Sequence, residues 1–227
     1  MDKYLKFVLT LSITVAVILL ILVVAMAVHY FTTRAKAKKL LQRGKRGGNF
    51  IYELLKTSFP KGRIFKQVML PIFSSDGKAR RYPADIVLVD HGGVYVIRVC
   101  NFSGAIDNTD TENWTVKNSN GITEIPNPFN QNRGGVKAIE SILRRENIYN
   151  IPIYNIVVFS GKKVNFRIRN EKLLTSARLI DTLKDMNRSK FLNQMDITET
   201  IYAIKKYLPR KRVQSDASKQ GVAAQKR

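Results

Sequence analysis

An uncharged apolar run near the amino terminus constrains the chain more than any other feature. It comprises residues 7–31, FVLTLSITVAVILLILVVAMAVHYF. As an α-helix, a run of this length crosses a hydrocarbon core about 30 Å thick. A cleaved signal peptide is the alternative, since Ala25-Met26-Ala27 resembles a cleavage site, but its apolar region is normally only about 7–15 residues long. We therefore expect a transmembrane helix over residues 7–31.

The charges on either side of this run predict its orientation. Residues 32–46, TTRAKAKKLLQRGKR, contain seven basic and no acidic side chains, whereas residues 1–6 carry Lys3 and Lys6 against Asp2. Basic clusters beside a membrane helix are retained on the cytoplasmic side. We expect a single-pass protein of the cell membrane, with a short extracytoplasmic N-terminus (1–6), a basic juxtamembrane linker (32–46) and a cytoplasmic domain.

The overall charge predicts a polyanionic partner. Lys and Arg total 39 against 17 Asp and Glu, a formal net charge of +22. Nucleic acid and an anionic membrane surface both fit such an excess, and a basic surface without a specific ligand is the third interpretation. Cys100 is the single cysteine. An intrachain disulfide and a cysteine-based zinc cluster are therefore excluded.

Beyond the linker the pattern predicts a small α/β domain. We expect a helix over 47–59, strands at 63–73, 84–90 and 93–100, and a hairpin joining 114–117 to 122–125. A helix capped by Asn127 is predicted to run to about Glu146 and to be followed by a buried strand at 151–160. The sequence Asp196-Ile197-Thr198-Glu199 predicts the start of a last helix ending near Leu208. Residues 209–227 are predicted to be a disordered tail.

Several motifs occur in one order: PADIVLVDHGGVYVIRVCNFSG at 83–104, Trp114, and NPFNQN at 127–132. Together they resemble the nuclease-related domain (NERD) family over roughly residues 44–160. The family pattern is an Asp entering a strand, a Gly-Gly turn, a strand ending in Glu-x-Lys, and Asn-aromatic-Ser-Gly. The resemblance implies a restriction-endonuclease-like α/β fold, a mixed sheet flanked by helices, over residues 47–160. Residues 161–208 would form a basic C-terminal extension with the final helix.

The sequence departs from the family where the chemistry is expected. Asp85 falls on the family Asp, but Arg98 and Cys100 occupy the positions of the Glu and the Lys, and Gly48 replaces a further Glu. Gln131 and Asn132 match the family motif beside the site that the resemblance implies, and a polar helix start is the structural alternative for them. Holding Mg²⁺ for phosphodiester hydrolysis requires carboxylate oxygens, and a fixed cation repels the metal. We expect Arg98 to pair with Asp85 in a forked hydrogen bond.

Individual residues have structural alternatives. Trp114 is expected in the core rather than as a base-stacking platform. Cys100 is either a small buried hydrophobe or a thiolate favoured by the neighbouring guanidinium. Gly44, Gly47 and Gly48 either bind phosphate through backbone amides at a helix start or form a hinge. His29 and His91 have no evident acidic partner, so the sequence does not support a catalytic triad.

Three functions are compatible with the sequence. The first is a membrane-anchored, catalytically degenerate NERD protein that binds DNA or RNA non-specifically and needs no cofactor. The second is an inner-membrane scaffold or interaction protein whose charge serves anionic lipid, at about 1 kcal/mol per basic residue. The third is an active nuclease, which alone would require Mg²⁺. The basic residues assigned to nucleic acid or lipid are Arg34, Lys36, Lys38, Lys39, Arg43, Lys45, Arg46, Lys162, Lys163, Arg167 and Arg169.

Overall fold

The computed structural model describes residues 19–24, 26, 46–73, 79–119, 121–188 and 191–209. The expected transmembrane helix over 7–31 lies largely outside the described residues, although 19–24 and 26 are helical and exposed. Among the residues described, no helix is both long and apolar enough to span a membrane. Most of the basic linker and the predicted tail from residue 210 also lie outside the described ranges.

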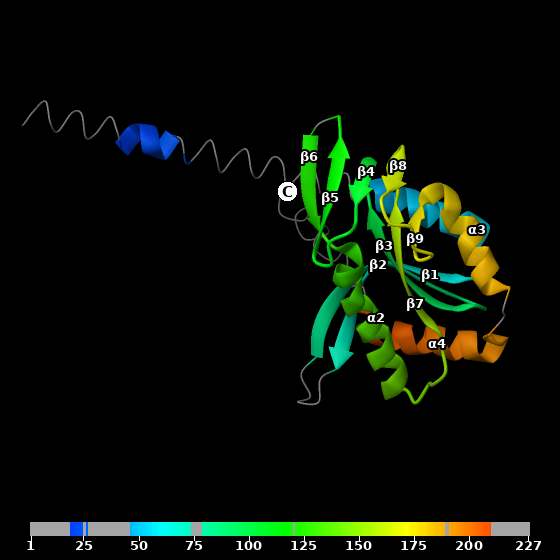
Figure 1. Cartoon of the computed structure of the whole chain (residues 1–227). Helices are drawn as coiled ribbons and strands as arrows, with labels where there is room; N and C mark the ends of the chain where they lie inside the picture. The colour runs from blue at the N-terminus through cyan, green and yellow to red at the C-terminus, as the bar shows by residue number, and fades with distance from the viewer. Residues whose placement is uncertain are drawn as a thin grey trace, which may run out of the picture.

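A five-stranded mixed sheet forms the centre of the fold (Figure 1). Its strand order is β1-β2-β3-β7-β9, and the strands are β1 (Arg63–Phe73), β2 (Ala79–Asp90), β3 (Gly93–Cys100), β7 (Ile153–Phe159) and β9 (Leu173–Thr175). The first three strands pair antiparallel, whereas β3, β7 and β9 are parallel. The predicted strands are confirmed. However, β2 begins before residue 84, because its first half pairs with β1 as far as Phe73↔Ala79.

Helices cover both faces of this sheet, which gives the predicted α/β architecture (Figure 1). The predicted first helix, residues 46–58, packs on one face with α3 (Ser176–Asn187). On the other face lie α2 (Pro128–Arg145) and α4 (Gln194–Tyr207). The alternation of β3 explains the two cores, since Tyr95 and Ile97 face the first helix whereas Val94 and Val96 face α2.

A second, four-stranded sheet has the order β6-β5-β4-β8. Its strands are β4 (Gly104–Asp107), β5 (Asn113–Asn118), β6 (Gly121–Pro126) and β8 (Val164–Phe166), and the β5–β6 pair is the predicted hairpin. Trp114 is 3% exposed and belongs to the apolar cluster that joins this sheet to Phe159 of β7. The expectation that Trp114 belongs to the core is thus confirmed.

The segment after residue 160 contributes to the same body. β9 extends the main sheet beside β7, and Leu179 and Leu183 of α3 are fully buried. The last helix begins at Gln194 rather than at Asp196. Asn193 is its N-cap, and Asp196 is the third helical residue, whose carboxylate accepts the Asn193 N–H in a capping box.

Candidate functional site

Asp85 lies where β2 separates from β3. The pairing of the two strands ends at Ile86↔Ile97. On the β1 side, Gln67 stands opposite Asp85 in the left-handed region, with φ 50°, a conformation that costs energy for a non-glycine residue. The pairing of β1 with β2 is therefore irregular at the point where the family resemblance places an Asp.

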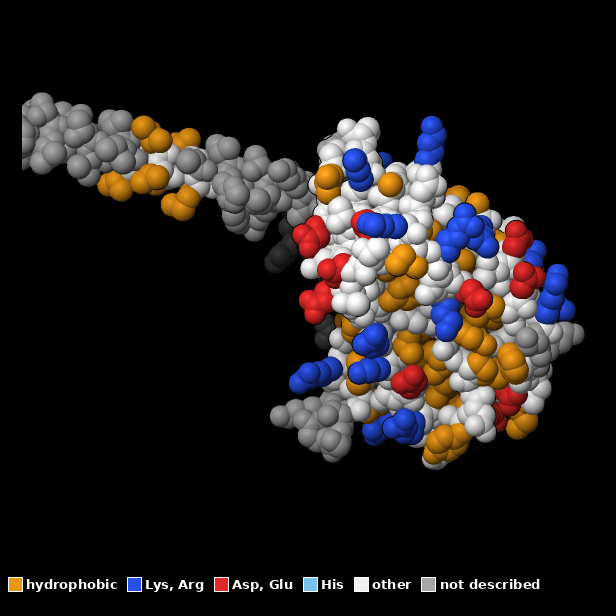
Figure 2. Space-filling view, viewed as in Figure 1, with side chains coloured by type: hydrophobic (Ala, Val, Ile, Leu, Met, Phe, Trp, Pro, Cys, Tyr) orange, Lys and Arg blue, Asp and Glu red, His pale blue; other side chains and the backbone are white. Residues whose placement is uncertain are grey.

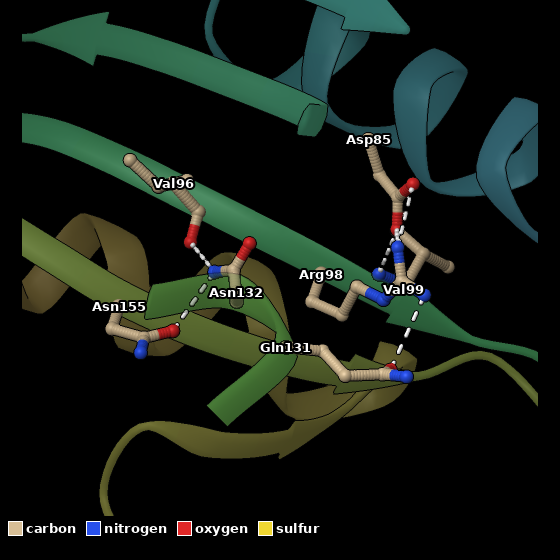
Figure 3. Close-up of polar contacts among 7 residues, drawn as sticks. All are labelled: Asp85, Val96, Arg98, Val99, Gln131, Asn132 and Asn155. Atoms are coloured by element: carbon tan, nitrogen blue, oxygen red, sulfur yellow. Dashed lines mark hydrogen bonds and ion pairs between the residues drawn. The ribbon is translucent and has the colours of Figure 1, made fainter. Parts of the chain in front are cut away.

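The Asp85 carboxylate is held by donors from β3 (Figure 3). The backbone N–H of Val99 donates to Oδ2 at 3.0 Å. Arg98 Nη1 lies 3.3 Å from both Oδ1 and Oδ2. The expected pairing with Arg98 is present but not forked, because a single guanidinium nitrogen serves both oxygens. This leaves the second terminal nitrogen of Arg98 available for another acceptor.

Gln131 of α2 provides that acceptor. Arg98 Nη2 donates to Gln131 Oε1 at 3.3 Å, so one guanidinium bridges β2 and α2 (Figure 3). The Arg98 and Asp85 side chains are 32% and 31% exposed. The structure therefore places three of the predicted site residues in one half-open polar cluster, the Asp85–Arg98–Gln131 cluster.

This cluster does not fit a divalent metal ion. Mg²⁺ is held by carboxylates together with water or substrate oxygens, but here the one carboxylate is occupied by an N–H group and a guanidinium. Within the described ranges, no group of three or more His, Cys, Asp and Glu side chains is arranged to hold a metal. The three side chains engage one another and join β2, β3 and α2, and they provide no ligand set for a metal.

Cys100 is buried at the end of β3. Burial raises the pKa of its thiol to about 12, because the apolar surroundings disfavour the thiolate, and the nearby Arg98 lowers this pKa by less. The alternative of an activated thiolate is therefore wrong, and Cys100 acts as a small apolar side chain at neutral pH.

Tyr82 and Gly134 belong to the site, and the sequence did not predict this. The ring of Tyr82 on β2 covers Gly134 of α2 so closely that a Cβ at position 134 would lie 2.2 Å from the ring. Burial raises the pKa of the Tyr82 hydroxyl. The positive charge of Arg98 lowers this pKa, and the negative charge of Asp85 raises it. The Gly134-Gly135 pair inside an amphipathic helix was the available signal, since such glycines indicate close packing.

A buried amide pair fixes α2 against the sheet (Figure 3). Asn132 is 2% exposed, and its side-chain nitrogen donates to the backbone oxygen of Val96 at 2.7 Å and to Asn155 Oδ1 at 2.8 Å. The Asn155 amide donates in turn to the backbone oxygen of Phe129. These bonds join α2 to β3 and β7, so they set the position from which Gln131 reaches Arg98.

Comparison with known proteins decides the family. Residues 43–160 match the family described as the nuclease-related domain. The chain belongs to the NERD family. No curated protein and no solved structure matches the chain. The matched range contains the whole Asp85–Arg98–Gln131 cluster, and it ends before β8, β9, α3 and α4.

Gly47 and Gly48 of the NERD first-helix motif are helical here rather than part of a hinge. A Cβ at Gly47 would lie 2.5 Å from Ser160 Oγ and 2.9 Å from Asn101 Cβ, so Gly47 allows the helix to approach the ends of β3 and β7. Position 48, where the NERD resemblance implies a Glu, is open, with nothing within 4 Å of an added Cβ. Gly44 lies outside the described residues.

The basic residues predicted to bind polyanions fall into different places. Arg34, Lys36, Lys38, Lys39, Arg43 and Lys45 lie outside the described ranges, and Arg46 is exposed at the start of the first helix. Lys162 and Lys163 are exposed between β7 and β8. Arg167 pairs with Asp107 at 2.7 Å. Figure 2 shows Lys and Arg side chains spread over the face that carries α2, β8 and α3, interspersed with acidic ones.

Proposed function

We propose that this protein is a membrane-anchored NERD protein whose domain binds nucleic acid without cleaving it. The observation that carries the proposal is the engagement of Asp85 by Arg98 Nη1 and by the Val99 N–H. A metal-dependent nuclease must present free carboxylate oxygens to its ion. In this chain the corresponding carboxylate is bound to a fixed positive charge.

The charge of the chain supports binding to a phosphate backbone. The excess of 39 basic over 17 acidic residues favours any polyanion, and binding through released counterions carries no sequence preference. A fold similar to the restriction endonucleases, which the NERD resemblance implies, would present exposed basic side chains such as Lys162 and Lys163 to a nucleic-acid strand.

One experiment tests binding and cleavage together. The full chain in a neutral detergent is titrated against fluorescein-labelled DNA and RNA at several salt concentrations, with and without Mg²⁺ or Mn²⁺. We expect affinity that falls steeply with salt, similar for unrelated sequences, and intact substrate after incubation. Metal-dependent cleavage that disappears in Asp85→Ala would contradict the proposal and identify an active nuclease.

We propose further that the domain faces the cytoplasm from the cell membrane. The uncharged run at 7–31 and the basic residues of 32–46 support this orientation. In a Cys100→Ser background, a cysteine at position 215 (Ser215→Cys) is expected to react with a membrane-impermeant maleimide only after cells are permeabilised. Labelling of intact cells would contradict this orientation, and the Cys100→Ser chain alone is the control.

A scaffold role on anionic lipid is the second candidate, favoured by the seven basic residues beside the membrane segment. The two roles differ in where the charge acts. Under the lipid role, neutralising residues 34–46 to glutamine would abolish binding of the chain to phosphatidylserine vesicles, and the chain would not bind labelled DNA or RNA. Binding of nucleic acid that survives this neutralisation favours the first proposal.

A further inference from the structure

A cavity of about 510 Å³ opens beside β8 and β9, away from the Asp85–Arg98–Gln131 cluster. Arg169 and Arg178 both line it, one from the β8–β9 connection and one from the first turn of α3. Cavities of this volume accommodate a small ligand or one unit of a polymer. Its position in the segment after residue 160 places it outside the part of the chain that matches the NERD family.

The two arginines of this cavity carry uncompensated charge. Among the described residues, no carboxylate forms an ion pair with Arg169 or Arg178, although Arg167 and Arg188 close by in sequence each have an aspartate partner. Glu171 lies in the same connection but does not line the cavity. Two guanidinium groups facing one cavity favour a phosphate, which they bind with paired N–H donors.

Neighbouring polar groups add further N–H donors to the cavity. Asn170 also lines the cavity, and its Oδ1 accepts the N–H of Lys172, which leaves its amide nitrogen to donate. α3 begins at Ser176, and the side chain of its N-cap, Thr175, makes no capping bond. Uncapped N–H groups and the positive end of the helix dipole strengthen an anion site that the arginines already define.

The rest of the lining is formed by the apolar Val164, Phe166 and Leu173 together with the polar Asn165. Phe166 is half-buried, with its ring supported edge-to-face by Phe159 at a centroid separation of 5.3 Å, and Leu173 lies beside it in the lining. An aromatic ring next to cationic side chains is the arrangement that binds single-stranded nucleic acid, since a base can stack while its phosphate is neutralised. A duplex keeps its bases stacked inside and cannot place one in a cavity.

We propose that this cavity binds one nucleotide of a single-stranded nucleic acid, with the phosphate between Arg169 and Arg178 and the base against Phe166. This inference rests on the proposed nucleic-acid binding and names the strand type and the residues that hold it. It makes the segment after residue 160 a binding element that lies beyond the matched family range.

The test compares two variants of equal charge. The full chain in neutral detergent is titrated with fluorescein-labelled dT10, with a hairpin duplex, and with an abasic ten-mer. Arg169→Ala/Arg178→Ala removes the cavity cations, and Lys184→Ala/Arg188→Ala removes two exposed cations near the far end of α3. We expect the cavity variant to bind dT10 about tenfold more weakly or worse, and the control to change by less than about twofold.

Two further readouts separate stacking from charge. The slope of log affinity against log salt for dT10 is expected to decrease in magnitude by about 0.7 in the cavity variant, because the one phosphate between the two arginines is no longer neutralised. The wild-type chain is expected to bind dT10 at least about fivefold more tightly than the abasic ten-mer, because only dT10 has a base to stack. Preference for dT10 over the duplex is expected as well.

The outcomes distinguish this inference from the proposed function. Wild-type protein that binds none of the three probes overturns both. Wild-type protein that binds, together with equal losses in the two variants, overturns only the cavity assignment. Equal affinity for dT10 and the abasic ten-mer contradicts the stacked base. A loss confined to the cavity variant and to dT10, with unchanged thermal unfolding, supports the proposal.

Discussion

The backbone N–H of Val99 donates to Asp85 Oδ2 at 3.0 Å, one residue beyond the point where the guanidinium of Arg98 meets the same carboxylate. The carboxylate thereby receives a strand N–H of β3 after the β2–β3 pairing has ended at Ile86↔Ile97. Asp85 thus stabilises the point at which β2 separates from β3. The positive charge of Arg98 compensates the negative charge of the Asp85 carboxylate.

Removing Asp85 should destabilise the domain. Asp85→Ala leaves the Val99 N–H and the Arg98 guanidinium without their acceptor, and we expect a loss of about 1–3 kcal/mol in the free energy of unfolding. The exposed Asp181→Ala on α3 is the control, with an expected change below about 0.5 kcal/mol. Urea unfolding measures both. A loss that persists undiminished in Asp85→Ala/Arg98→Met would show that the unpaired charge contributes nothing.

Two glycine-to-alanine changes should act in opposite directions. Gly134→Ala places a Cβ 2.2 Å from the Tyr82 ring, so the ring must move, at a cost of about 1–3 kcal/mol. Gly48→Ala adds a Cβ in open space within a helix and should stabilise by about 0.5–1 kcal/mol. Thermal and urea unfolding of the two variants provide the measurement. Equal effects would contradict the close packing of Tyr82 on α2.

Alkaline pH should destabilise the fold through Cys100. The thiol has a pKa of about 12 in the folded protein and about 8.5 when unfolded. The stability that the buried neutral thiol contributes is fully present below about pH 8.5. It is lost as the pH rises toward 12, because the unfolded chain releases the thiol proton first. The slope reaches about 1.4 kcal/mol per pH unit. Cys100→Ala should show a shallower slope between pH 8 and 10.5 in urea unfolding, with the tyrosine contributions unchanged.

Acid should weaken the contact between α2 and α4. Lys206 Nζ donates to both carboxylate oxygens of Glu146, at 2.9 Å and 2.8 Å, and the Tyr207 hydroxyl donates to Oε1. The bonds from Lys206, and to a smaller extent from Tyr207, lower the pKa of Glu146. The stability they provide is therefore present above the ordinary pKa of Glu and is lost as the pH falls through the lowered value. Glu146→Gln should lower Tm at pH 7, and the difference from wild type should shrink below about pH 4.

The predicted strands and helices were correct where burial produces a long apolar pattern. β3 and β7 are almost entirely apolar, and the Asn127 cap with Pro128 begins α2 as expected, with Asn127 Oδ1 accepting the Phe129 N–H. β8 and β9 have three residues each, too few to produce a pattern. α3 was not predicted, although Leu179 and Leu183 are spaced as on one helix face.

From the sequence pattern alone, only the part of the candidate site that lies on β3 was predictable. Alternation on β3 puts Arg98 and Cys100 on one face, and the resemblance to the NERD family brought Asp85 and Gln131 into the same group. The bond from Val99 and the ring of Tyr82 over Gly134 depend on how β2 leaves β3 and how closely α2 approaches β2. These are tertiary distances, and no periodicity in one segment encodes them. The cavity at Arg169 and Arg178 depends in the same way on the pairing of β9 with β7.

The pairing of β9 with β7 also determines where the chain can be divided. Val157, Val158 and Phe159 of β7 pair with β9, which lies beyond the range matched by the family. An expression fragment ending at residue 160 would turn β7 into a bare hydrophobic sheet edge, a template on which further copies could add strands. Such a fragment should aggregate rather than fold, so the recognisable family segment and the smallest foldable unit of this protein differ by the residues from β8 to α4.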